Sequence, residues 1–245
     1  TGHGAAKFGL TDDVVRNLLD HQEDYPHLRF AGLHIHIGSQ LHDTAATEQA
    51  VRSALELIAP YPTIRTINIG GGLPTAYSDD ETLPDVHLFA DAPEPRLTEY
   101  DWILEPGSSI AADAGLLVAR VLYVKEQGGH KFVIIDAGMT ELIRPALYEA
   151  HHEIVPLIEP ARDSQREQVE VVGPVCETTD TLAHARLLPP LRPGDAVALL
   201  TAGAYGAVMA SSYNARPRPP EVVVAENGVE WHVSTPRQHI EAMDF

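Results

Sequence analysis

The 245-residue sequence predicts an α/β region followed by a mostly β region. Up to residue 108, helix-like and strand-like stretches alternate, which is typical of parallel strands joined by crossover helices. Three strand-like runs in this region end in glycine or polar residues, as at the carboxyl face of a (β/α)8 barrel. After residue 118, strand-like runs follow one another between turn signals. We therefore expect the C-terminal portion of a TIM-like barrel in residues 1–112 and a mostly antiparallel β-barrel or sandwich domain in residues 113–245.

The first region carries clear helix signals. Thr11 is a credible N-cap before an apolar stripe that ends near Glu23, and a second helix begins at Asp43 or Thr44 and stops at Pro60. The expected strands are 29–37, 64–69 and 101–104, with a short helix at 84–92. A complete eight-stranded barrel needs roughly 250 residues, so we expect the remaining strands to lie upstream of Thr1.

The second region reads as a series of strands with one helical-looking segment at 140–153. Asn227-Gly228 between two valine-rich runs is a strong hairpin signal. The expected strands are 116–126, 131–136, 169–176, 196–201, 221–225 and 229–233.

Composition excludes several classes of partner. The net charge of −18 argues against nucleic acid and against an anionic membrane surface, because both bind basic patches. A single cysteine rules out an internal disulfide and fits a reducing compartment. No apolar run reaches the length of a membrane span, and residues 1–10 lack the pattern of a signal peptide. We expect a cytoplasmic protein.

The central motif is the run from Thr66 to Gly72, in which a strand-like stretch ends in three glycines. Consecutive glycines leave backbone N–H groups open to close approach, which suits a phosphate. A tight turn after a buried strand explains the same residues equally well. The other two strand ends carry His34-Ile35-His36-Ile37-Gly38-Ser39 and Glu105-Pro106-Gly107.

His34 and His36 lie two apart and share a face of their strand. No matching third ligand accompanies them, so we expect no metal site. Stacking on a planar cofactor suits His36, whereas His34 reads as a satisfied core histidine. Glu105 ends an apolar strand and needs a cationic partner, for which a pyridinium N–H would serve.

Three further segments hold candidate site residues. Arg144 and Tyr148 share a face if their segment is helical, and Arg144 would either grip a carboxylate or form a surface ion pair. Cys176 lies beside Glu177 at a strand end, where a lone cysteine is usually packing. Tyr205 lies in a glycine-rich loop and could present its hydroxyl to a phosphate.

The order of these motifs resembles the diaminopimelate decarboxylases, which are alanine-racemase-like, fold type III pyridoxal-phosphate enzymes. The shared motifs are His-Ile-His-Ile-Gly-Ser-Gln (34–40), Gly-Gly-Gly (70–72), Glu-Pro-Gly (105–107), Asp-Ala-Gly-Met (136–139), Arg-Pro-Ala-Leu-Tyr (144–148), Gly-Pro-Val-Cys-Glu (173–177), Gly-Ala-Tyr-Gly (203–206) and Tyr-Asn-Ala-Arg-Pro-Arg-Pro (213–219). The resemblance covers nearly the whole chain. It implies decarboxylation of meso-2,6-diaminopimelate to L-lysine and CO2, a pyridoxal 5'-phosphate cofactor and a homodimer with shared active sites.

The resemblance also implies roles for single residues. His36 would stack on the pyridoxal ring, Glu105 would pair with the pyridine nitrogen, and Cys176 would protonate the carbon that loses CO2. The phosphate contacts would come from Ser39, Gly70, Gly71, Gly72, Gly107 and Tyr205. The substrate contacts would come from Arg144, Tyr148, Glu177 and Tyr205.

Two departures from the family pattern leave alternatives open. Ser108 stands where the family motif has arginine, and none of Lys7, Lys125 and Lys131 lies in the context of the lysine that forms the Schiff base. We therefore expect an N-terminally truncated chain that is inactive alone. The alternatives are a non-catalytic regulatory homologue that binds pyridoxal phosphate, or a decarboxylase of another basic amino acid such as ornithine.

Overall fold

The computed structural model describes residues 7–91, 93, 98–157, 165–225 and 232–233. The chain divides into two compact units, and each is considered by itself. The first comprises residues 1–76 and 80–110, and the second comprises residues 77–79 and 111–245. The predicted hairpin turn at Asn227-Gly228 lies outside the described residues.

The first unit contains a three-stranded parallel sheet of β1 (Gly32–His34), β2 (Thr66–Asn68) and β3 (Asp101–Ile103). All three strands are shorter than predicted, because only these residues form ladder pairs. One register row joins Leu33, Ile67 and Trp102. The next row begins with His34 and Asn68, which therefore lie on the opposite face. This alternation separates the apolar side of the sheet from its polar side.

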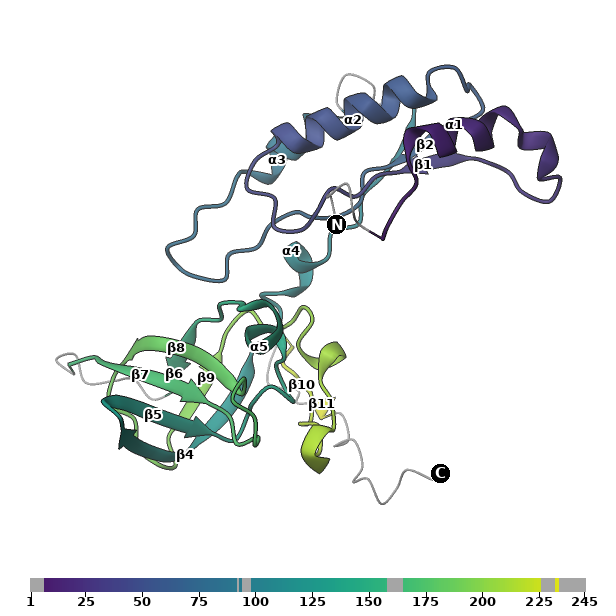
Figure 1. Ribbon diagram of the computed structural model, residues 1–245. Helices are drawn as coiled ribbons and strands as arrows, with labels where there is room; N and C mark the ends of the chain where they lie inside the picture. The colour runs from purple at the N-terminus through teal and green to yellow at the C-terminus, as the bar shows by residue number, and fades with distance from the viewer. Residues whose placement is uncertain (1–6, 92, 94–97, 158–164, 226–231, 234–245) are drawn as a thin grey trace. The chain divides into compact units, whose positions relative to one another are not determined.

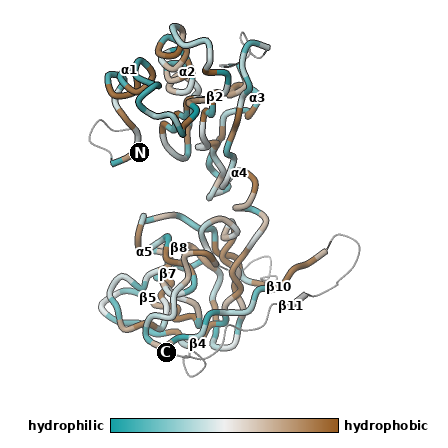
Figure 2. The backbone as a smooth tube through the Cα atoms, turned by 90° about the vertical axis from the view of Figure 1, so that its right-hand side faces the viewer, coloured by the Kyte–Doolittle hydropathy of each residue, from teal (hydrophilic) through white to brown (hydrophobic). Residues whose placement is uncertain are grey.

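Helices cover the apolar side of this sheet (Figure 1). Leu19 of one helix and Ile58 of another pack with Ile67 of the central strand in one buried cluster. Figure 2 shows both polar and apolar stretches along α1 and α2, as expected for amphipathic helices. The helical elements are α1 (Asp12–Asp20), η1 (Gln22–Asp24), α2 (Ala45–Ile58), α3 (Val86–Ala90) and α4 (Ser108–Ala111). None of the described helices is both long and apolar enough to cross a membrane.

The second unit is built on a six-stranded sheet that curls into a nearly closed barrel (Figure 1). The strand order is β6-β9-β4-β5-β7-β8, and among these described strands only β5 and β7 pair in parallel. The strands are β4 (Leu117–Gln127), β5 (His130–Ile135), β6 (Ile154–Pro156), β7 (Glu167–Val172), β8 (Thr181–Leu188) and β9 (Ala196–Leu199). The mostly antiparallel β architecture is thus as predicted.

Several predicted elements of this unit are wrong in extent. Residues 140–153 do not form one helix: only α5 (Arg144–Tyr148) is helical, and it ends because Glu149 is left-handed at φ 55°. β6 and β8 were not predicted, since neither segment alternates cleanly in hydropathy. The remaining elements are η3 (Ala207–Met209), η4 (Tyr213–Ala215) and the small antiparallel pair β10 (Val222–Val223) and β11 (His232–Val233).

A β-bulge shapes the edge strand β8. Val169 pairs with Arg186 but Val171 pairs with Ala183, so two residues of β8 stand opposite Glu170. The Glu170 carboxylate accepts hydrogen bonds from the backbone N–H of Ala185 at 3.1 Å and from the His184 ring at 2.7 Å. Ala185 is left-handed at φ 49°. Because a bulge redirects the residues that follow it, this one sets the direction of Arg186.

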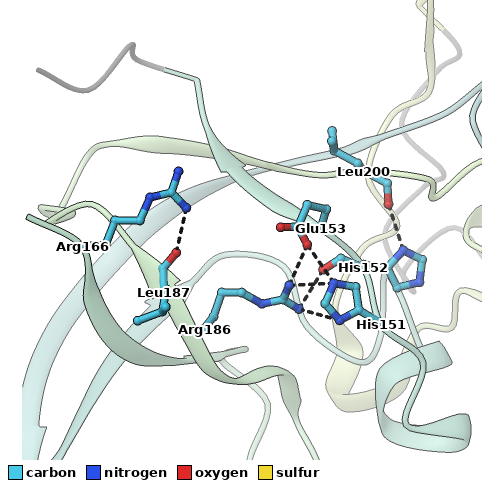
Figure 3. Close-up of polar contacts among 7 residues, drawn as sticks. All are labelled: His151, His152, Glu153, Arg166, Arg186, Leu187 and Leu200. Atoms are coloured by element: carbon cyan, nitrogen blue, oxygen red, sulfur yellow. Dashed lines mark hydrogen bonds and ion pairs between the residues drawn. The ribbon is translucent and has the colours of Figure 1, made fainter. Parts of the chain in front are cut away.

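Arg186 bridges the two edge strands of the sheet (Figure 3). Its guanidinium donates to the Glu153 carboxylate at 2.7 Å and to the His152 carbonyl at 3.1 Å, both just before β6. The Arg186 side chain is only 14% exposed. No backbone ladder joins the described strands β8 and β6, and the Arg186 side chain therefore makes the contact between β8 and the residues that precede β6.

His152 fills the interior beside this bridge. It is fully buried, and its Nδ1 lies 2.9 Å from the Leu200 carbonyl (Figure 3). Burial lowers the pKa of His152 from 6.5 to about 4, with the nearby Arg144, His151 and Arg186 charges acting in the same direction and the Leu200 contact opposing them. His152 is therefore neutral at physiological pH.

The Arg186 bridge predicts a selective loss of stability. Replacing Arg186 with methionine keeps the apolar bulk but leaves Glu153 without its buried guanidinium. We expect the free energy of unfolding to fall by about 2–4 kcal/mol, measured by urea denaturation. The matched control is Arg166→Met: Arg166 is exposed and donates to the Leu187 carbonyl at 3.3 Å, so its loss should cost less than about 0.5 kcal/mol. Equal effects in the two variants would contradict the bridging role.

The lowered pKa of His152 predicts a pH-dependent contribution to stability. The unfolded chain binds a proton at His152 below about pH 6.5, whereas the folded chain does so only near pH 4. The contribution of neutral His152 to the free energy of unfolding is therefore fully present above pH 6.5. It is lost as the pH falls toward 4, by up to about 3 kcal/mol. The stability difference between the wild type and His152→Gln should shrink over that window in urea titrations. A difference that stays constant from pH 7 to pH 4 would refute the assignment.

Candidate active site

In the first unit, polar side chains converge at the carboxyl ends of the parallel strands. Asn68, at the end of β2, donates from Nδ2 to the Glu105 carboxylate at 2.7 Å. His34 Nε2 lies 3.8 Å from the same carboxylate oxygen, and both side chains are about half exposed. The interpretation of His34 as a core histidine is therefore wrong, because its side of the sheet is the polar one. Glu105 is held in place by the Asn68 amide.

The three glycines follow β2 directly and pack closely against its neighbours. Gly70 (φ 73°) and Gly72 (φ 96°) take left-handed conformations, and a Cβ on Gly70 would lie 2.7 Å from His36 Nδ1. The Gly70 N–H is bonded to the Asn68 side chain at 2.8 Å, whereas the Gly71 N–H meets the His36 ring at 3.4 Å. The glycines thus form a tight turn, and they leave a surface without side chains beside His36.

Ser39 lies in a loop that is anchored directly after it. The Gln40 side chain both donates to and accepts from the backbone of Thr75, at 2.8 and 3.0 Å. The Leu41 N–H donates to the Gly72 carbonyl at 3.0 Å. Ser39 is exposed and directly precedes both anchors. Its segment is therefore held against the end of the glycine run.

Gly107 is exposed and precedes α4, whose first residue is Ser108. A Cβ on Gly107 would meet open space, so packing does not require a glycine there. Two of the described lysines lie in the second unit. Lys131 pairs with Glu167 at 2.6 Å, and Lys125 lies over the Phe132 ring, both on the β4–β5 hairpin.

In the second unit, Arg144 begins the short helix α5, as the predicted helical segment requires. Its guanidinium donates to His152 Nε2 at 2.8 Å and lies 4.3 Å from the centre of the Tyr77 ring. No ion pair between Arg144 and a carboxylate occurs within the described residues. The surface ion-pair interpretation is thus not supported, and the charge of Arg144 is not neutralised by these neighbours. Tyr148, at the other end of α5, is exposed.

Cys176 and Glu177 are both exposed, so the packing interpretation of Cys176 is wrong. The Tyr213 hydroxyl donates a hydrogen bond to the Glu177 carboxylate. This bond raises the pKa of Tyr213, because the carboxylate favours the protonated phenol. The Tyr-Asn-Ala-Arg motif thereby orients the predicted substrate-binding acid.

Buried charges hold the loops that carry these residues. The Asp180 carboxylate accepts from the N–H groups of Met139 and Val175, each at 2.6 Å. It thereby ties residues 136–139 to the loop that precedes Cys176. Arg216 donates to the Asp136 carbonyl at 2.6 Å and pairs with Glu141 at 3.5 Å. Asp136 of the Asp-Ala-Gly-Met motif and Arg216 of the Tyr-Asn-Ala-Arg motif are thus joined by a hydrogen bond, although they are far apart in sequence.

Tyr205 is exposed and left-handed at φ 60°, a conformation that bulky residues rarely adopt. Such an outlier suits a side chain held in place for function. Among the described residues, no group of three His, Cys, Asp or Glu side chains is placed to hold a metal ion.

Sequence reasoning missed four residues that organise the site. They are Asn68, His152, Asp180 and Tyr213. Asn68 and Tyr213 lay within recognised motifs, but their partners Glu105 and Glu177 are 37 and 36 residues away. His152 could have been noticed as a histidine eight residues after Arg144, although nothing local indicates that it is buried.

The comparisons with known proteins agree with this arrangement. The family model for the C-terminal sheet domain of pyridoxal-dependent decarboxylases matches residues 14–203. The diaminopimelate decarboxylase of Zymomonas mobilis is 39% identical over 236 residues, covering 93% of this chain and 55% of that protein. The Vibrio cholerae diaminopimelate decarboxylase is 41% identical over 234 residues, with the same two coverages.

Solved structures lead to the same family. The crystal structure of Helicobacter pylori diaminopimelate decarboxylase complexed with L-lysine matches with a TM-score of 0.84 at 35% identity, covering 95% of this chain and 58% of that one. The chain therefore spans a little over half the length of the relatives it matches. On these grounds, the chain belongs to the ornithine, diaminopimelate and arginine decarboxylase family of pyridoxal-dependent enzymes.

Proposed function

We propose that the natural polypeptide carrying residues 1–245 decarboxylates meso-2,6-diaminopimelate to L-lysine and CO2. The observation that carries this proposal is that the second unit holds one cation and one anion that are each positioned by uncharged side chains. Arg144 has no carboxylate partner within the described residues, and Glu177 is exposed and oriented by Tyr213. A substrate with a carboxylate and an ammonium group at its far end complements these two side chains. The relatives named above support the choice of diaminopimelate.

The residues of the first unit fit pyridoxal 5'-phosphate. His36 would stack on the ring, while Ser39, the glycines 70–72 and Gly107 would approach the phosphate. Tyr205 is a further proposed phosphate contact. Glu105, held by Asn68, would accept a hydrogen bond from the protonated pyridine nitrogen. When bound, the cofactor supplies the electron sink that loss of CO2 requires.

The remaining chemistry belongs to side chains of this chain. Arg144 and Tyr148 would bind a substrate carboxylate, and Glu177 would bind the far ammonium group. Cys176 is exposed beside Glu177 and would deliver a proton to the carbon atom from which CO2 departs. We further propose a cytoplasmic homodimer whose subunits share their active sites.

One observation favours a second candidate function. Ser108 supplies no charge where the family motif has arginine, and it begins α4 as a helical residue. Loss of that cation would weaken a phosphate or substrate contact, as in a homologue that binds the cofactor without turnover. Formation of L-lysine by the purified polypeptide separates the two functions.

The proposed roles of the two acids predict different kinetic defects. Glu105→Gln keeps the shape but removes the charge that stabilises the protonated ring nitrogen, so kcat should fall by about 10²-fold with little change in KM. Glu177→Gln should mainly raise KM, because it weakens binding of the far ammonium group. Both are measured as L-lysine formed from diaminopimelate by the natural polypeptide with pyridoxal phosphate. Near-normal kcat in Glu105→Gln with the cofactor bound would remove Glu105 from the mechanism.

A further inference from the structure

We propose that His152 is a positioning residue that fixes the orientation of Arg144 for the substrate carboxylate. The proposal rests on the substrate-binding role proposed above for Arg144. His152 lies outside the residues considered so far for cofactor or substrate, and it acts through Arg144 alone.

Two hydrogen bonds determine the tautomer of His152. The Leu200 carbonyl, 2.9 Å from Nδ1, can only accept, so Nδ1 carries the proton. The Arg144 guanidinium, 2.8 Å from Nε2, can only donate, so Nε2 presents its lone pair. Both nitrogens are therefore satisfied in the neutral ring, and a protonated ring would confront Arg144 with a second donor.

Tyr77 restricts the orientation of the Arg144 guanidinium further. The Arg144 guanidinium lies 4.3 Å from the Tyr77 ring centre, within the range of a cation–π contact. The Tyr77 ring in turn meets the His152 ring edge-on, with centroids 5.4 Å apart. One N–H of Arg144 is thus held by an imidazole and its planar face by an aromatic ring. Its other N–H donors stay available for a planar carboxylate.

The backbone around His152 is anchored on both sides. Arg186 donates to the His152 carbonyl at 3.1 Å, and the Leu200 N–H donates to the Glu153 carbonyl at 2.8 Å. Figure 3 shows His152 between Leu200 and the Arg186–Glu153 pair. His152 therefore has little freedom to follow a moving Arg144, and Arg144 must adapt to it.

Two substitutions separate positioning from packing. Asparagine at 152 places its amide near Nδ1 and can keep the Leu200 bond, but it offers Arg144 no acceptor. Glutamine reaches the position of Nε2 and can accept from Arg144, but it loses the Leu200 bond. Both variants lose ring packing, so both should be less stable than the wild type.

The test measures KM and kcat for diaminopimelate with the natural polypeptide and pyridoxal phosphate. We expect His152→Asn to raise KM about five- to twentyfold with kcat nearly unchanged, and His152→Gln to restore most of this loss. In an Arg144→Lys background, His152→Asn should add less than about twofold, because the two residues act as one unit. Equal KM values in the Asn and Gln variants, or full additivity with Arg144→Lys, would overturn the positioning role.

A spectroscopic readout separates this proposal from the proposed function. Nitrogen-15 NMR of the wild type should show His152 with protonated Nδ1 and bare Nε2, and slowed rotation of the Arg144 guanidinium. His152→Asn should release that rotation and His152→Gln should not. If the wild type forms no L-lysine, or if Arg144→Lys leaves KM unchanged, the proposed substrate role fails even when the NMR result holds. If L-lysine forms but Arg144 rotates freely in the wild type, only the positioning proposal fails.

Discussion

The Arg186–Glu153 contact is the constraint on which the architecture of the second unit depends. Its sheet has two open edges, β6 and β8, and backbone ladders alone leave them unpaired. Arg186 joins them through an ion pair with Glu153, a bond to the His152 carbonyl and contacts with the His151 ring. Arg186 is mostly buried and Glu153 is partly buried, so removing either partner would leave the other charge without its counterpart in a partly desolvated place. The bulge in β8 opposite Glu170 directly precedes Arg186.

A short series of hydrogen bonds links the Arg186–Glu153 contact to Arg144 in the candidate site. Arg186 fixes the backbone at His152, and His152 meets Arg144 at the start of α5. Elsewhere in the unit, Asp180 holds the loops around Met139 and Val175, and Arg216 holds the Asp136 carbonyl. The charges that hold the structure are thus satisfied internally. The charges with proposed functions, such as Glu105 and Glu177, are exposed and are oriented by neutral groups.

The sequence was informative about elements and motifs, but less so about contacts over long separations. Alternating helix and strand signals correctly predicted a parallel sheet, because β1, β2 and β3 carry local hydrophobic patterns. β8 escaped prediction because its bulge breaks the alternation between Ala183 and Arg186. His34 was misjudged because apolar neighbours do not reveal which face of a strand is covered. The bond between Tyr213 and Glu177 depends on a turn at η4 that includes the left-handed Asn214, which local propensity does not specify.

The choice of a neutral histidine beside Arg144 has an energetic reason. A carboxylate at the same position would attract the guanidinium with roughly 4 kcal/mol at 4 Å in a partly screened environment. A substrate carboxylate would then have to compete with that internal pair. The hydrogen bond from the charged guanidinium to a neutral imidazole contributes about 1.5–3 kcal/mol, which is weaker than the ion pair, yet it still sets the direction of Arg144. Deep burial keeps His152 neutral across the physiological pH range, as its pKa of about 4 indicates. The arrangement therefore orients Arg144 while leaving its charge free for an anionic ligand.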